Sequence, residues 1–122
     1  MGASGVAAGA VGAHLLEEHL AAKQLAQYDT AVRYQLLHAL ALLLIGALGQ
    51  IRSSRALSAA GWLFLVGVLL FSGCLYGYVA AVAMPLMRRF LAAFIAIGGS
   101  LLILGWLALG VHAVAGQQSK PE

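Results

Sequence analysis

Long apolar stretches without Asp, Glu, Lys or Arg alternate with short polar segments along this chain. The uncharged stretches cover residues 1–16, 34–51, 57–82 and 90–114. Because a helix needs roughly 20 apolar residues to cross a bilayer, each stretch predicts a membrane-spanning helix. The first predicts a short span, unless the chain continues upstream of Met1. Four such helices joined by short turns predict an all-α, integral membrane four-helix bundle with up-down topology, in a single domain over residues 1–115.

Two polar segments complete the predicted architecture. Residues 20–33 mix apolar side chains with Lys23, Gln24 and Asp29, which predicts a partly helical interfacial segment between the first two spans. Residues 116–122 form a polar tail, which we expect to be disordered.

Composition supports a lipid environment and narrows the possible functions. Apolar residues make up 62% of the chain and charged residues 9%, against roughly 45–50% and about 25% in soluble domains. The net charge of +3 comes from seven Lys and Arg near the ends of apolar stretches, which favours membrane lipid as a partner over nucleic acid. Cys74 is the only cysteine, so it forms no intrachain disulfide. Since the N-terminal residues also lack a secretory signal pattern, we expect a multi-pass protein of the bacterial inner membrane.

A cluster of polar side chains stands where the second span begins. Arg33 is the last charge before this span, and on a helix Tyr34, Gln35 and His38 share one face because they are three or four residues apart. We expect an interfacial lock, in which Arg33 reaches lipid phosphates or the carboxylates of the first loop. The candidate polar cluster comprises His14, Glu18, Arg33, Tyr34, Gln35 and His38.

Small residues inside the spans predict close contacts between helices. The chain has 15 glycines, most of them within spans, and small residues allow helix backbones to approach closely in a bilayer. This favours a tightly packed bundle over a wide water-filled lumen. The candidate packing positions are Gly5, Gly9, Gly12, Ser72, Gly73, Gly77, Gly98, Gly99 and Gly105.

The residue types argue against an enzyme and against a bound metal. No carboxylate lies inside any predicted span, and Ser72 lacks a nucleophile-elbow motif. His14 and His19 are about 140° apart around a helix, so they cannot converge on one zinc ion. We therefore predict no catalytic residue, no metal site and no cofactor.

Three hypotheses for function remain open. The leading one is a structural or accessory bundle that associates with lipid, with its own copies as a homo-oligomer, or with a larger membrane complex. Sparse ionisable residues in the spans disfavour a proton pump, but a small-solute or ion channel formed by an oligomer stays open. The third is haem binding, with His14 and His38 at one membrane face as two axial ligands.

Five motifs occur in order along nearly the whole chain. They are Gly9-Ala10-Val11-Gly12-Ala13-His14, then Thr30 through Leu42, then Leu70-Phe71-Ser72-Gly73 with Leu75-Tyr76, then Ile97-Gly98-Gly99, and Gly105-Trp106. Together they resemble the YgdD-like family of small four-span inner-membrane proteins, a domain of unknown function with eukaryotic TMEM relatives. The resemblance implies a four-helix membrane protein and brings no assigned activity. Relatives often have proline where this chain has Ala96, which implies a weaker kink in the fourth span.

Overall fold

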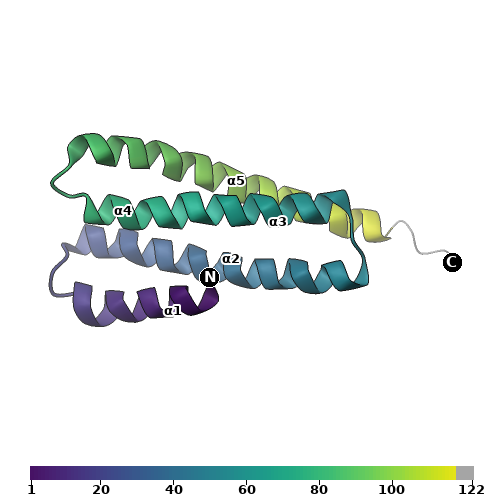
Figure 1. The fold of residues 1–122 in the computed structure, drawn as a ribbon, viewed down its shortest axis with the longest axis horizontal. Coiled ribbons are helices and arrows are strands. Elements are labelled where there is room, and N and C mark those ends of the chain that lie inside the picture. The colour runs from purple at the N-terminus through teal and green to yellow at the C-terminus, as the bar shows by residue number, and fades with distance from the viewer. Residues whose placement is uncertain (118–122) are drawn as a thin grey trace.

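The described residues, 1–117, form helices and no strands in this computed structural model (Figure 1). Helix α1 (Gly2–Val11) continues into the π-helical turn η1 (Gly12–Leu16), and α2 covers Ala22–Ile51. Helix α3 (Arg55–Val68), the π-helical turn η2 (Leu69–Gly73) and α4 (Cys74–Ala80) follow one another without a break, and α5 covers Pro85–Gln117. These elements make four helical rods that run in alternating directions, so the predicted all-α, up-down bundle is confirmed.

Three of the four rods are long and apolar enough to cross a membrane, namely Ala22–Ile51, Arg55–Ala80 and Pro85–Ala115. At 1.5 Å per residue they are about 45, 39 and 46 Å long, against about 30 Å of bilayer hydrocarbon. The apolar rod over Gly2–Leu16 is about 22 Å long. The described chain therefore has three helices long enough to cross a bilayer and one shorter helix packed beside α2.

The predicted segment over residues 20–33 is not a separate element between the first two spans. Helix α2 begins at residue 22 and continues without a break into the second span. At its first turn the Ala21 N–H donates to the Gln24 side-chain oxygen at 3.0 Å, which caps the helix. Further along, Val32 is buried where α1 packs against α2. Residues 22–33 therefore form the first turns of one long helix.

The C-terminal boundary also differs from the prediction. The fourth span begins at Pro85, and α5 extends to Gln117, so the first two residues of the predicted tail are helical. The rest of that tail, residues 118–122, lies outside the described residues.

The core of the bundle lies where α3 and α5 pack against each other beside α2. A Cβ on Gly98 would lie 2.5 Å from the Phe71 amide nitrogen, and a Cβ on Gly105 would lie 2.5 Å from the Phe64 ring. At Gly98, α5 therefore approaches α3 and η2 almost backbone to backbone, as small residues allow in a bilayer. The buried side chains of this core are Ala41, Phe64, Val68 and Leu102.

Helices α1 and α2 are also held close together by glycine. A Cβ on Gly5 would lie 2.8 Å from the Leu36 side chain, and a Cβ on Gly12 would lie 2.8 Å from the Tyr28 ring. Three further candidate packing positions leave room for ordinary side-chain contacts, namely Gly9, Gly77 and Gly99.

The prediction that Gly73 packs closely against another helix is wrong. Among the described residues, no neighbouring side chain or helix lies within 4 Å of a Cβ built there. The reason is local, because Gly73 ends the π-helical turn η2 and faces a cavity beside the buried Ser72. Gly67, which precedes the turn, makes the close contact instead, with a Cβ 2.7 Å from the Leu102 side chain.

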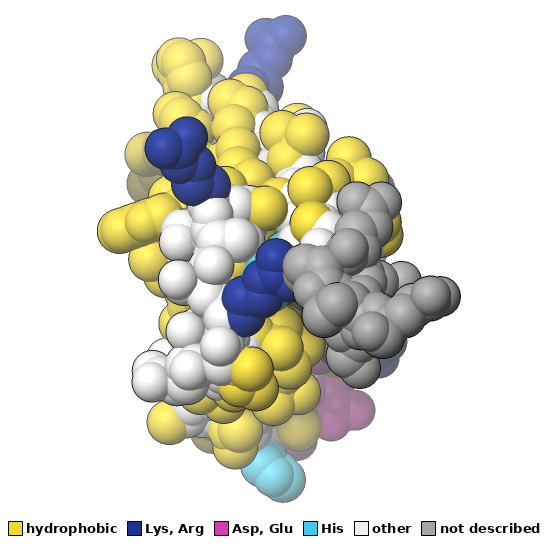
Figure 2. Space-filling view, turned by 90° about the vertical axis from the view of Figure 1, so that its right-hand side faces the viewer, with side chains coloured by type: hydrophobic (Ala, Val, Ile, Leu, Met, Phe, Trp, Pro, Cys, Tyr) yellow, Lys and Arg dark blue, Asp and Glu magenta, His cyan; other side chains and the backbone are white. Residues whose placement is uncertain are grey.

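Apolar side chains cover the sides of the bundle, and charged residues stand at its ends. Figure 2 looks onto the right-hand end of Figure 1 and shows Lys and Arg side chains with hydrophobic side chains around them. Arg52 and Arg55 flank the turn between α2 and α3. At the opposite end, Arg88 and Arg89 lie in the first turns of α5. An apolar belt between charged ends suits a bilayer.

Candidate functional site

Gln35 joins three parts of the bundle through its side-chain amide. Its Nε2 donates to the Met1 carbonyl at 3.1 Å and to Ser4 Oγ at 2.9 Å, both on the α1 side. Its Oε1 accepts a hydrogen bond from the Tyr76 hydroxyl of α4 at 2.8 Å. We call Ser4, Gln35 and Tyr76 the Gln35 junction, because these three side chains tie α1, α2 and α4 together.

Tyr28 extends these contacts toward the loop between η1 and α2. Its hydroxyl donates to the Ala8 carbonyl at 2.9 Å, and its ring centroid lies 5.1 Å from that of Tyr76 at an interplanar angle of 58°. Tilted aromatic pairs at this distance attract each other. Tyr28 therefore fixes α1 to α2 at a second point, about ten Å along α2 from Gln35 at 1.5 Å per residue.

His38 occupies a buried aromatic pocket formed by α2, α3 and α5. Its side chain is 1% exposed, and its ring centroid lies 5.2 Å from that of Phe64 and 6.1 Å from that of Trp106. Nδ1 lies 2.8 Å from the Tyr34 carbonyl. Since a carbonyl only accepts, we assign the proton to Nδ1. Nε2 is then an acceptor, buried without a hydrogen-bond partner.

The predicted polar cluster does not form as one unit. Arg33, His14 and Glu18 are exposed, and in the described part of the chain no hydrogen bond or ion pair connects them to Gln35 or His38. The reason for Arg33 is helical geometry, because two residues correspond to about 200° around a helix and place it away from Gln35.

The two histidines of the haem hypothesis lie far apart along the bundle. Gly12 lies against Tyr28, which puts His14 near that level of α2. His38 follows Tyr28 by about 15 Å along the same helix. A pair of axial ligands is therefore not formed. Within residues 1–117, no group of three or more His, Cys, Asp or Glu could hold a metal ion.

A small, mostly apolar cavity of about 140 Å³ adjoins the Gln35 junction. Ser4, Gln35 and Tyr76 line it together with Ser72 and Gly73 of η2. Ser72 is 2% exposed, and its Oγ has no hydrogen-bond partner. The sequence predicts Ser72 as a packing position and argues against it as a catalytic nucleophile. The signal for a different role lies in the π-helical turn, because such turns occur frequently at functional sites.

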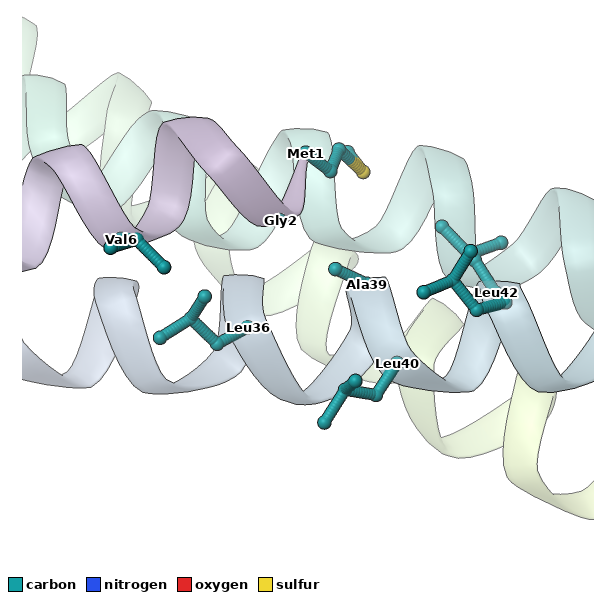
Figure 3. Close-up of a pocket in the computed structure, with 8 residues that line it drawn as sticks. Met1, Gly2, Val6, Leu36, Ala39, Leu40 and Leu42 are labelled. Carbon is teal, nitrogen blue, oxygen red and sulfur yellow. The ribbon is translucent and has the colours of Figure 1, made fainter.

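An apolar groove of about 600 Å³ lies between the start of α1 and the middle of α2 (Figure 3). The side chains that border it include Met1, Val6, Leu36, Leu40 and Leu42. These side chains offer dispersion contacts and no charge, so the groove suits hydrocarbon.

Two polar contacts outside the Gln35 junction were not predicted. At the α2–α3 turn, Ser54 Oγ accepts a hydrogen bond from the Leu57 N–H, and it lies 2.7 Å from His112 Nδ1 of α5. At the other end of the bundle, the Arg88 guanidinium lies 4.2 Å from the Tyr78 ring centroid. Serine before a helix is a recognisable N-cap signal, but its partner on α5 depends on tertiary packing.

The rods, the apolar belt and the buried polar contacts define a small helical membrane protein. Comparison with known sequences identifies its family. Residues 8–99 match the model of a family described as a protein of unknown function (DUF423), so the chain belongs to that family. No solved structure matches the chain.

Curated relatives are named UPF0382 membrane proteins. One from Staphylococcus haemolyticus is 42% identical over 104 residues, covering 85% of this chain and 80% of the relative. One from Haemophilus influenzae is 38% identical over 106 residues, covering 85% and 79%. YwdK from Bacillus subtilis is 34% identical over 110 residues, covering 89% and 85%. These matches confirm the resemblance to a membrane family of unknown function.

Proposed function

We propose that this protein is a non-catalytic bundle of the bacterial cytoplasmic membrane that acts by association, as an accessory subunit of a membrane assembly. The observation that carries the proposal is how its buried polar groups are used. The hydrogen bonds of the Gln35 and Tyr28 side chains connect different helices. Side chains occupied in this way hold a shape and do not present reactive groups to a substrate.

The outer surface supports a role in association with lipid and protein. Helix α5 is the least covered of the long helices, with 17% of its most apolar window buried. Its exposed face carries small residues at every fourth position, namely Ala92, Ala96 and Ser100. This face points away from the buried positions 98, 102 and 105. In a bilayer, small residues at this spacing allow another helix to approach closely.

Cross-linking in the native membrane tests the proposal. The protein is extracted with its surrounding lipid into polymer-bounded nanodiscs and treated with a short amine- or carboxyl-reactive cross-linker. We expect a discrete product above the 12.6 kDa chain, either a multiple of this mass or a complex with a second protein. A chain that stays at its own mass, or that sustains solute flux in liposomes, would contradict the proposal.

A matched pair of variants then identifies the surface. Ala96→Trp places a large ring in the row of small residues, whereas Ile97→Trp places the same ring on the adjacent exposed position. If α5 meets a partner through its small residues, only Ala96→Trp removes the cross-linked product. If both variants keep the product, the partner binds elsewhere on the bundle and the role of α5 is refuted.

A further inference from the structure

Ser72 differs from Thr30 and Ser100, which also lie within helices. A serine or threonine inside a helix commonly donates to the carbonyl four residues back. Thr30 donates to Ala26 in this way at 2.8 Å, and Ser100 donates to Ala96 at 3.0 Å. Ser72 stands in the π-helical turn η2, where it is buried without a partner. An unpaired buried hydroxyl lowers stability. A bound molecule that hydrogen-bonds to Ser72 would remove this cost.

The hydrogen bonds around the cavity define what that group must be. Both amide hydrogens of Gln35 and the hydroxyl hydrogens of Tyr76 and Ser4 are already donated. The free donor is therefore the Ser72 hydroxyl, and the free acceptors are the oxygens of the same residues. A group that accepts one hydrogen bond and donates one satisfies both, and a hydroxyl does so. The side chains of Val68 and Leu69 complete the wall of the cavity, so the bound group also meets apolar atoms there.

The cavity lies at the depth where lipid hydroxyls are found. Ser72 follows Arg55 by about 26 Å along its helix, and Gln35 precedes Arg52 by about the same distance. Since the hydrocarbon layer is about 30 Å thick, a boundary at the two arginines puts the cavity just inside the opposite boundary. Leu69, which also lines the cavity, is 58% exposed. The cavity therefore opens beside a side chain that faces acyl chains.

We propose that this cavity binds the free hydroxyl of an uncharged membrane lipid such as a diacylglycerol. A volume of about 140 Å³ exceeds the roughly 30 Å³ of one water molecule several-fold and admits the hydroxyl together with neighbouring glycerol carbons. The acyl chains remain outside, against the apolar surface near Leu69. This inference rests on the membrane placement of the proposed function, but it does not require assembly with a partner.

Photolabelling in nanodiscs tests the site. The full chain is placed in phosphatidylcholine nanodiscs with a photoreactive diacylglycerol, and unlabelled 1,2-dioleoylglycerol competes with it. The matched competitor is 1,2-dioleoyl-3-acetylglycerol, whose hydroxyl is capped. We expect the free alcohol to compete and the capped lipid to fail. Ser72→Ala is expected to weaken labelling about five-fold, the effect of one hydrogen bond.

Two further variants separate binding from folding. Ser100→Ala removes a hydroxyl that already has a partner on its own helix, and it should leave labelling unchanged. Gly73→Val adds a side chain at a position that lines the cavity and where an added Cβ has open space, and it should abolish labelling while the melting temperature stays near that of the wild type. Equal competition by the capped lipid, or equal labelling of Ser72→Ala and wild type, would overturn the proposal. Labelling is independent of cross-linking, so either proposal can fail alone.

Discussion

Gly98→Ala probes the closest contact of the bundle. The added Cβ would lie 2.5 Å from the Phe71 nitrogen, 2.9 Å from the Gly67 carbonyl oxygen and 2.9 Å from the Phe71 Cα. All three are backbone atoms, so a side-chain rotation cannot relieve the overlap. Because ordinary contacts to a Cβ begin at 3.4 Å, α5 must move away from α3 and η2 by about 0.9 Å at this point.

The expected loss follows from two opposing effects. Overpacking a close contact costs about 1–3 kcal/mol and occasionally more, while replacing glycine by alanine inside a helix gains about 1 kcal/mol. A shift of α5 also loosens the contact between Leu102 and Phe64 in the core. We therefore expect Gly98→Ala to lower the free energy of unfolding by about 1–2 kcal/mol.

Gly99→Ala is the matched control. The same substitution one residue later places its Cβ 3.5 Å from the Phe71 ring, which is an ordinary contact. It shares the gain in helix propensity, so its stability should equal or exceed that of the wild type by up to about 1 kcal/mol. Both variants are unfolded in mixed detergent micelles and followed by circular dichroism. Equal stabilities for the two would refute the packing of α3 against α5 described here.

The same unfolding assay tests three polar contacts. His38→Ala should lower the free energy of unfolding by about 2–4 kcal/mol through the cavity it leaves. His38→Phe keeps a ring but also removes the Nδ1 hydrogen bond to the Tyr34 carbonyl, so its loss should be smaller than that of His38→Ala; equal losses would refute the packing of this ring against Phe64 and Trp106. Tyr76→Phe removes the hydrogen bond to Gln35 and should lower the free energy of unfolding by about 0.6 kcal/mol. If Tyr76→Phe causes the same decrease in a Gln35→Leu background, the hydrogen bond contributes nothing. Ser54→Ala removes a helix cap and should lower the free energy of unfolding by about 1 kcal/mol. The double variant with His112→Ala should lose less than the sum of the two single variants, because the two side chains contact each other.

The class of fold was predictable because the signal is local. Uncharged stretches longer than a bilayer crossing require helices, since no other open structure satisfies its backbone hydrogen bonds in lipid. The start of α2 was not predictable by this rule. Lys23 and Asp29 interrupt the apolar pattern, and the pattern does not reveal that α1 covers the opposite side of the same turns, where Val32 is buried.

The candidate site was only half predictable. Helical spacing places Gln35 and His38 on the inward side of α2, because that relation depends on one helix alone. Their partners depend on how other helices dock, and Ser4 and Tyr76 come from segments 31 and 41 residues away from Gln35. The error at Gly73 has a local cause that periodicity misses, because the wider π-helical turn changes which residues share a face.

The two halves of the bundle are held together by different means, and this difference explains where polar chemistry is found. Helix α5 meets α3 and η2 almost backbone to backbone at Gly98 and lies against the Phe64 ring at Gly105, which leaves no room for a bound molecule. Helix α1 packs on α2 through Gly5 and Gly12, and the side chains of Gln35 and Tyr28 add hydrogen bonds to this contact. Such hydrogen bonds contribute only about 0.6 kcal/mol each in a membrane, so the junction of α1 can rearrange around a ligand without separating the core. A lipid hydroxyl bound beside Ser72 would add to these contacts and strengthen the attachment of α1.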